Sequence, residues 1–137
     1  MLTVRQIMTE KIVTVEMDDK LLVVKEIFDN LKFHHLLVTE NELLFGVLSD
    51  RDLLKALSPN LGQLSETAKD KESLNKRAHQ IMTRKPITLR PEAPITDAAN
   101  LFITRSISCL PIVDEKFKPV GIVSWRDVMK ALLSGKQ

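Results

Sequence analysis

The chain repeats a segment of its own sequence 75 positions later, and this repeat constrains the fold more than any other feature. Residues 46–57 and 121–132 align without a gap. Seven of the twelve positions are identical (Gly, Ser, Arg, Asp, Lys, Ala and Leu), and four exchange one apolar residue for another. Only Asp50 and Trp125 differ in character. A repeat at this spacing predicts two copies of one structural unit.

Each copy has the pattern of a strand that turns into a helix. A glycine introduces a short apolar run, and Ser-x-Arg-Asp follows at Ser49 and at Ser124, ahead of apolar residues at helical spacing. Ser-x-x-Asp is close to a capping box, in which the hydroxyl accepts a hydrogen bond from a free backbone N–H of the first turn. A helix start with a hydroxyl and a guanidinium can also hold a phosphate, and a carboxylate beside it can accept hydrogen bonds from a ribose diol. The sequence leaves both interpretations open.

The repeat extends over nearly the whole chain. Gln-Ile-Met-Thr occurs at residues 6–9 and 80–83, and each copy continues with a β-branched run that predicts a strand. An apolar helical stripe follows in each copy, then a second short apolar run, a turn and the segment described above. Each copy therefore has the order β-α-β-β-α, which predicts an α/β (α+β) fold. We expect repeats at 1–57 and 78–133, a linker at 58–77 with a partial helix near 64–74, and a tail at 134–137.

Composition excludes several classes of protein. The 137 residues, 44% of them hydrophobic, suffice for one compact domain built of two half-size repeats. The 20 basic and 18 acidic residues are scattered, so no basic stripe indicates nucleic-acid binding. Cys109 is the only cysteine, which favours a reducing compartment. No apolar run approaches the ~18 residues of a membrane span, and no leader pattern is present, so we expect a soluble cytoplasmic protein.

In their order and spacing, these motifs resemble the CBS motif, named after cystathionine β-synthase. The resemblance rests on three features: the Met-Thr pair near the start of each copy, the Leu-Pro-Ile-Val-Asp run at 110–114, and the Gly-x-x-Ser-x-x-Asp pattern near the end of each copy. It covers about residues 1–57 and 78–133, and two such repeats in tandem form a Bateman module. The first copy departs from the pattern, because 35–39 reads His-Leu-Leu-Val-Thr and lacks the proline and the aspartate.

The resemblance implies a regulatory module that binds an adenine nucleotide (AMP, ADP or ATP). In the family the repeats pack about a pseudo-twofold axis and leave two clefts, and a homodimer is implied. The ligand state would pass to an unknown effector protein or to the module's own dimer. S-adenosylmethionine is an alternative ligand, and a ligand-free dimerisation module is an alternative function. The nucleotide would be a regulatory ligand and not a cofactor.

The resemblance also implies which residues line the two clefts. In each, the aspartate of one repeat takes the ribose, and the first strand of the other repeat flanks the base. Carried over by position, one cleft joins Ser124, Arg126 and Asp127 to Ile12, Val13, Phe33 and His34. The other joins Ser49, Arg51 and Asp52 to Pro86, Ile87, Ser108 and Cys109.

An enzyme is not expected from this sequence. It has no nucleophile and base at motif spacing, no Gly-rich phosphate loop, and only four glycines. No metal site is expected either, because His34 and His35 are adjacent strand residues whose side chains point to opposite faces. Cys109 is expected to be a buried apolar residue, as a lone cysteine usually is.

Other repeated residues have two interpretations. Met8 and Met82 are expected to pack in a core, and the alternative is a position that flanks the base of the ligand. Lys55 and Lys130 are either solvated helix charges or contacts for a polyphosphate tail. Removal of Asp127 is expected to reduce binding and leave stability almost unchanged.

The two clefts are expected to differ because of the one discordant position. Asp50 would repel phosphates beside Asp52, whereas Trp125 offers an uncharged surface. The cleft at Ser124 is therefore expected to bind the more highly phosphorylated ligand.

Overall fold

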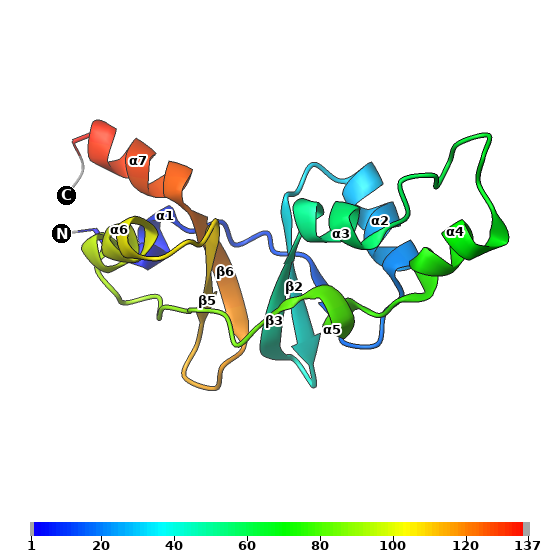
Figure 1. Ribbon diagram of the computed structural model, residues 1–137. Coiled ribbons are helices and arrows are strands. Elements are labelled where there is room, and N and C mark those ends of the chain that lie inside the picture. Colours follow the sequence, from blue (N-terminus) through cyan, green and yellow to red (C-terminus); the bar gives the residue numbers. More distant parts are fainter. Residues whose placement is uncertain (1, 136–137) are drawn as a thin grey trace. The chain divides into compact units, whose positions relative to one another are not determined.

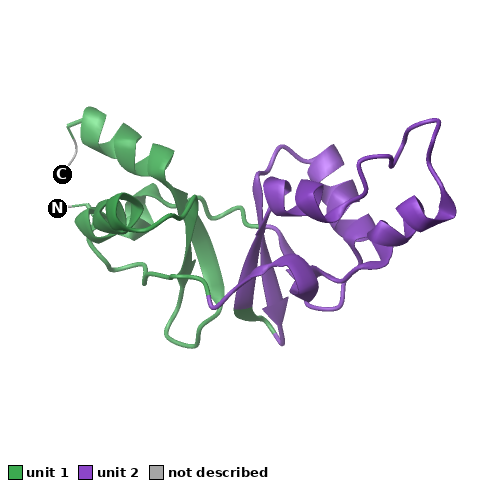
Figure 2. Cartoon of the chain, in the orientation of Figure 1, with its two compact units in different colours: residues 1–12, 42–44, 86–137 green, residues 13–41, 45–85 purple. Residues whose placement is uncertain are grey.

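The computed structural model describes residues 2–135, which form two compact units (Figure 1, Figure 2). Both units combine helices with a sheet, so the predicted α/β (α+β) class is confirmed. Unit 1 takes its described residues from 1–12, 42–44 and 86–137, and unit 2 from 13–41 and 45–85.

Unit 2 is built around a four-stranded sheet with the order β1-β2-β3-β4. Strand β1 runs parallel to β2, and β4 runs antiparallel to β3. Leu21, Leu36 and Leu48 are fully buried and come from a helix and two strands, so they join these elements in one core. The elements are β1 (Thr14–Glu16), α2 (Leu21–Asn30), β2 (His35–Glu40), β3 (Leu43–Ser49, whose first two residues fall in unit 1), α3 (Asp50–Ala56), α4 (Ala68–Glu72), a 3-10 turn (Ser73–Asn75), α5 (Ala78–Ile81) and β4 (Thr83–Arg84).

Unit 1 repeats this plan with fewer regular strand residues. Its hairpin is flanked by two single bridges, Leu89 parallel to β5 at Ile112 and Thr9 antiparallel to β6 at Ile122. The run at 86–89, expected to be a strand, makes only this one bridge; Pro86 begins it and has no N–H to donate. The elements are α1 (Val4–Ile7), α6 (Ile95–Thr104), β5 (Cys109–Val113), β6 (Pro119–Ser124) and α7 (Trp125–Leu133).

The two short entry helices are exchanged between the sequence repeats. Helix α1, at the start of the first repeat, donates its first N–H groups to second-repeat carbonyls: Val4 to Ala93 at 2.8 Å and Arg5 to Pro91 at 2.9 Å. Helix α5 does the reverse, because the Ala78 N–H donates to the Asp19 carbonyl at 2.8 Å. These bonds satisfy N–H groups that a helix start leaves without partners. Each compact unit is therefore completed by a segment from the other sequence repeat.

The repeated methionine and glycine pack against each other in both units. A Cβ on Gly121 would lie 2.5 Å from Met8 Sδ and 3.2 Å from the Thr9 carbonyl oxygen. Gly46 has the same relation to Met82, and the Thr83 carbonyl oxygen is closer, at 2.9 Å. The expected packing of both methionines is confirmed, because each contacts the core of its unit. Glycine is needed here because the entry segment crosses the strand too closely for a side chain.

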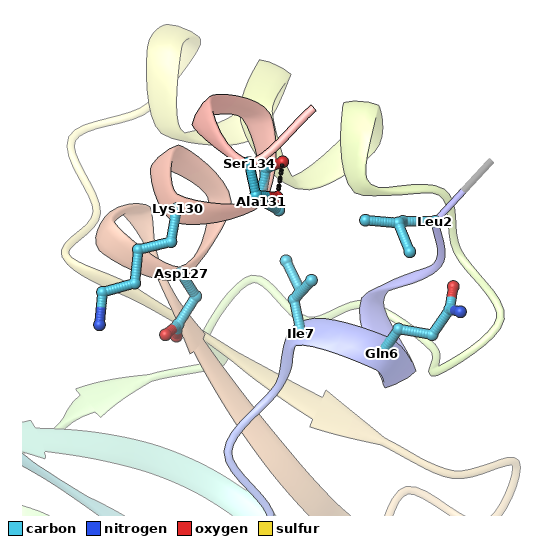
Figure 3. A pocket seen from close by; sticks show the side chains of 7 residues that line it. All are labelled: Leu2, Gln6, Ile7, Asp127, Lys130, Ala131 and Ser134. Carbon is cyan, nitrogen blue, oxygen red and sulfur yellow. Dashed lines mark hydrogen bonds between the residues drawn. The ribbon is translucent and has the colours of Figure 1, made fainter. Parts of the chain in front are cut away.

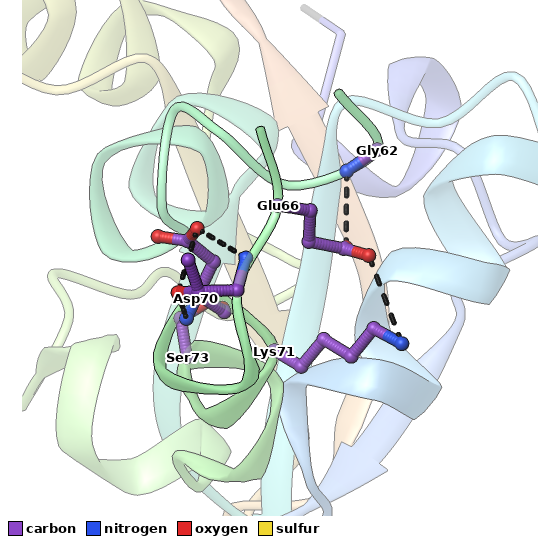
Figure 4. A network of polar contacts seen from close by, with 6 residues as sticks. Gly62, Glu66, Asp70, Lys71 and Ser73 are labelled. Atoms are coloured by element: carbon purple, nitrogen blue, oxygen red, sulfur yellow. Dashed lines mark hydrogen bonds and ion pairs between the residues drawn. The ribbon is translucent and has the colours of Figure 1, made fainter. Parts of the chain in front are cut away.

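The segment between the repeats is ordered by polar contacts (Figure 4). Asp70 accepts hydrogen bonds from the Ser58 hydroxyl at 2.6 Å and the Thr67 backbone N–H at 2.8 Å. Glu66 accepts from the Gly62 N–H at 3.1 Å and lies 3.7 Å from the Lys71 ammonium. The partial helix predicted near 64–74 is confirmed for α4, which begins only where the Thr67 side chain caps it.

In the part of the chain that the structure describes, no helix is long and apolar enough to cross a bilayer.

We predict that Gly46→Ala destabilises the protein by about 1–3 kcal/mol, the usual cost of overpacking. Gly121→Ala should cost less, because the carbonyl beside Gly121 is farther away and Met8 is less buried than Met82. Urea unfolding of both variants measures the difference. Equal costs, or no cost at Gly46, would show that the entry segments can move aside.

Candidate functional site

The two Ser-x-Arg-Asp turns form reciprocal capping boxes at the starts of α3 and α7. At α7, Ser124 Oγ accepts from the Asp127 N–H at 3.3 Å, and Asp127 Oδ2 accepts from the Ser124 N–H at 2.8 Å. At α3, the corresponding distances for Ser49 and Asp52 are 3.1 and 2.9 Å. The capping interpretation of the sequence is therefore confirmed in both copies.

The capping boxes leave some polar groups of the turns without a partner among residues 2–135. Only Oδ2 of Asp127 takes part in the cap, and none of the described residues donates a hydrogen bond to Oδ1. The exposed guanidinium of Arg126 makes no ion pair or hydrogen bond within residues 2–135. One carboxylate oxygen and one cation thus stand at each helix start, so capping and ligand binding are compatible.

The cap also revises one expectation. Asp127 itself accepts from the Ser124 N–H and from the Ser124 hydroxyl, at 2.8 and 3.1 Å. Removing Asp127 therefore removes part of the cap, and the expectation that Ser124 alone preserves stability is incomplete. Loss of a capping contact typically costs about 1 kcal/mol.

The predicted cleft residues are divided between the two units. Their grouping into two clefts stays a prediction. Val13 and Ile87 are partly buried, each against the core of its own unit. Unit 1 holds Ile12, Pro86, Ile87, Ser108, Cys109, Ser124, Arg126 and Asp127; unit 2 holds Val13, Phe33, His34, Ser49, Arg51 and Asp52.

In unit 2, His34 lies against the polar turn of its own repeat. Its Nδ1 is 3.0 Å from Asp50 Oδ2, and its carbonyl accepts from the Asp50 N–H at 3.0 Å. The hydrogen bond from His34 is the main cause that lowers the pKa of Asp50. The carboxylate expected to repel phosphates therefore has an imidazole partner, which the sequence did not indicate.

In unit 1, Cys109 pairs with Ser124 across the β5–β6 ladder. The thiol is 8% exposed, so the expected burial is confirmed. Burial raises the pKa of the Cys109 thiol to about 12. A thiol that stays protonated is neither a nucleophile nor a metal ligand at neutral pH, and Cys109 offers only apolar surface beside the turn.

Within residues 2–135, no group of three or more His, Cys, Asp or Glu side chains is arranged to hold a metal ion.

Each polar turn adjoins a groove between its helix and the exchanged entry helix. In unit 1 the groove has a volume of about 470 Å³, and Figure 3 shows Asp127 and Lys130 on α7 with Ile7 on α1. In unit 2 a groove of about 320 Å³ includes Asp52 and Lys55. The sequence did not indicate these grooves, although the isoleucine and the Lys-Ala pair that line both of them are repeated in it. The unit 1 groove is lined by Leu2, Gln6, Ile7, Asp127, Lys130, Ala131 and Ser134, and the unit 2 groove by Asp52, Lys55, Ala56, Lys76 and Ile81.

The fold and the paired polar turns define a tandem β-α-β-β-α module in which a capping box with an adjacent arginine starts the last helix of each copy. A family model for the CBS domain matches residues 4–59 and 78–134. The chain therefore belongs to the CBS domain family and contains two CBS domains in tandem. A CBS domain-containing protein of Dictyostelium discoideum is 31% identical over 132 residues, which are 95% of this chain and 90% of that protein.

Solved structures with this fold include complexes with adenosyl compounds. The crystal structure of CBSX2 in complex with AMP has a TM-score of 0.80 and 27% identity, and covers 100% of both chains; CBSX2 is a CBS-pair protein of Arabidopsis thaliana. The CBS domain pair of protein MJ0100, in complex with 5′-methylthioadenosine and S-adenosylmethionine, has a TM-score of 0.78 and 26% identity, and covers 99% of this chain and 98% of that one.

Some relatives are much longer than this chain. A homoserine O-acetyltransferase of Methanococcoides burtonii is 30% identical over 131 residues, which are 95% of this chain but 24% of that protein.

We predict that stability falls as the pH is lowered from 7 to 5. Burial is the main cause that lowers the pKa of His35 from its ordinary value near 6.5, so the unfolded chain binds the proton more readily. The stabilising contribution of neutral His35 is present above that value and is lost as the pH falls through the folded-state pKa. Urea unfolding at each pH measures the slope, and His35→Leu should flatten it. An unchanged slope in the variant would assign the pH dependence to other groups.

Proposed function

We propose that this tandem CBS module is a regulatory sensor of an adenine nucleotide, and that the Ser-x-Arg-Asp turn of each repeat binds the ribose and phosphate. The ligand would occupy the two clefts that the family resemblance implies. The module would pass the bound state to an effector protein or through its own assembly. The nucleotide is a regulatory ligand in this proposal, and the module catalyses no reaction.

This proposal rests on one observation: in each turn only one oxygen of the aspartate carboxylate takes part in the helix cap. A cap alone requires only one carboxylate oxygen, and Oδ2 of Asp127 fills that role. The turn also carries an arginine that no described residue engages, and the same arrangement stands at Asp52. A carboxylate oxygen for a diol and a guanidinium for a phosphate are the groups a nucleotide needs.

S-adenosylmethionine is the second candidate ligand, supported by the MJ0100 domain pair in its complex with that compound. The arginines favour a phosphorylated ligand, because S-adenosylmethionine carries a cationic sulfonium. A thermal-shift series with AMP, ADP, ATP and S-adenosylmethionine separates the two. A ligand at 100 times its dissociation constant should add about 2.7 kcal/mol of stability.

Our proposal assigns a regulatory role to this module and does not assign it the enzymatic activity of the longer relatives. The acetyltransferase named above has about three quarters of its length outside the matched region. We place the protein in the cytoplasm on the basis of its lone buried thiol, which suits a reducing compartment.

We predict that Asp127→Ala lowers nucleotide affinity by at least ten- to a hundredfold. The variant loses charge-assisted hydrogen bonds worth about 1.5–3 kcal/mol each, and 1.4 kcal/mol is a factor of ten. Isothermal titration calorimetry measures the affinity, and urea unfolding measures the accompanying loss of the cap.

Asp127→Asn is the matched control. Its amide oxygen can still accept from the Ser124 N–H, so stability should stay near that of the parent protein while affinity falls. If both variants bind normally and only Asp127→Ala is destabilised, the turn is a helix cap and the ligand proposal is wrong.

We also propose that the module forms a homodimer through the outer face of α7. Val128 and Ala131 are buried, whereas Trp125, Met129 and Leu132 are 55, 44 and 42% exposed. The three exposed residues are spaced i, i+4 and i+7, so they form one apolar stripe on the helix. A second copy of the chain would cover this stripe in an isologous contact.

Light scattering should give twice the mass of one chain, and Met129→Glu should shift the protein towards the monomer. Leu64→Glu is the control, since Leu64 is an exposed apolar residue that lies outside α7. A parent protein that stays monomeric at high concentration would contradict the proposal.

A further inference from the structure

The groove between α1 and α7 contains a cation that the proposed function does not use. Lys130 lies one turn beyond Asp127, and both residues line the groove, with Ile7 on the opposite wall (Figure 3). No carboxylate within residues 2–135 forms an ion pair with Lys130. The lysine is present in both repeats, although neither the cap nor the core requires it.

The second repeat of the fold serves as an internal comparison. Asp52, Lys55, Ala56 and Ile81 line the unit 2 groove at positions equivalent to those of Asp127, Lys130, Ala131 and Ile7. There Lys76 crosses the groove end, where its ammonium donates to the Ala56 carbonyl at 2.9 Å. In unit 1 the equivalent Ala131 carbonyl accepts instead from the short Ser134 side chain, at 2.8 Å.

The two grooves also differ in volume and in the residue at this end. Leu2 stands where unit 2 has Lys76, so among residues 2–135 only Lys130 brings a cationic side chain to the lining of this groove. The volume is about 470 Å³, compared with about 320 Å³ in unit 2. Lys130 is therefore the groove's own cation, beside a carboxylate that has one oxygen to spare.

The two charges of the groove define the ligand that fits it. The Asp127 carboxylate can accept a hydrogen bond from a hydroxyl group, and the Lys130 ammonium can bind an anion. The two side chains are neighbours, because residues three apart lie on the same face of a helix. A ribose that donates one hydroxyl to Asp127 presents its adjacent hydroxyl position next to that carboxylate. Its 5′ carbon is attached on the opposite face of the sugar ring from the two hydroxyls, so a 5′-phosphate extends away from the hydroxyl that Asp127 binds.

Resting on the proposed ribose site at Asp127, we propose that the unit 1 groove is a subsite for a second phosphate, carried on the 2′ or 3′ oxygen of the ribose. Asp127 binds the remaining hydroxyl, and Lys130 binds this phosphate and offsets its repulsion by the Asp127 carboxylate. The subsite makes the module selective for a nucleotide phosphorylated at both ends of its ribose. Without such a phosphate, Lys130 contributes nothing to binding.

Calorimetry with 5′-AMP, adenosine 3′,5′-bisphosphate and adenosine 2′,5′-bisphosphate tests the proposal. One bisphosphate should bind about tenfold or more tightly than 5′-AMP, as expected for one charge-assisted contact. Lys130→Met should abolish this gain and leave 5′-AMP affinity unchanged, and Lys130→Arg should preserve it. Lys116→Met is the control, because Lys116 is an exposed lysine of unit 1 outside the groove.

The possible failures are distinguishable. If 5′-AMP binds through Asp127 but neither bisphosphate binds more tightly, the subsite is refuted and the proposed function stands. The same conclusion follows if Lys130→Met keeps the gain. If none of the three nucleotides binds and ADP and ATP do not bind either, the proposed function fails together with the subsite.

Discussion

The exchange of entry helices is the constraint on which the rest of the structure depends. Helices α1 and α5 have only four residues each, too few to be stable alone. Their first N–H groups are satisfied by carbonyls of the opposite repeat, and Val4 and Ala78 are buried in the opposite core. Each unit therefore forms only when the other repeat supplies a segment, which makes the tandem pair the smallest complete fold.

The exchange also explains why the repeated motifs stand at their positions. Met8 and Met82 fill the space that Gly121 and Gly46 leave open, so the Met-Thr and Gly-led motifs are the two halves of one contact. The strand that contains this glycine ends at the Ser-x-Arg-Asp turn, where the helix cap fixes the carboxylate. Packing at the glycine thereby helps to hold the polar turn at the end of the same strand.

The two turns share one backbone design but have different surroundings. In unit 2 the discordant Asp50 is held by His34, whereas in unit 1 Trp125 is more than half exposed. The grooves beside the turns differ as well, because Lys76 occupies the position that Leu2 has in unit 1. Equivalent aspartates in such different settings give the module a basis for two unequal sites.

Much of this protein could be predicted from its sequence. The internal repeat predicted two copies of one fold, and the Ser-x-x-Asp pattern predicted both helix starts, because capping depends on residues three apart. The exchange of α1 and α5 could not be predicted, since its hydrogen bonds join residues such as Val4 and Ala93 that are far apart in the chain. The same holds for His34 beside Asp50 and for the groove at Lys130. Local patterns determine which elements form, but only the packed fold decides which residues of different elements meet.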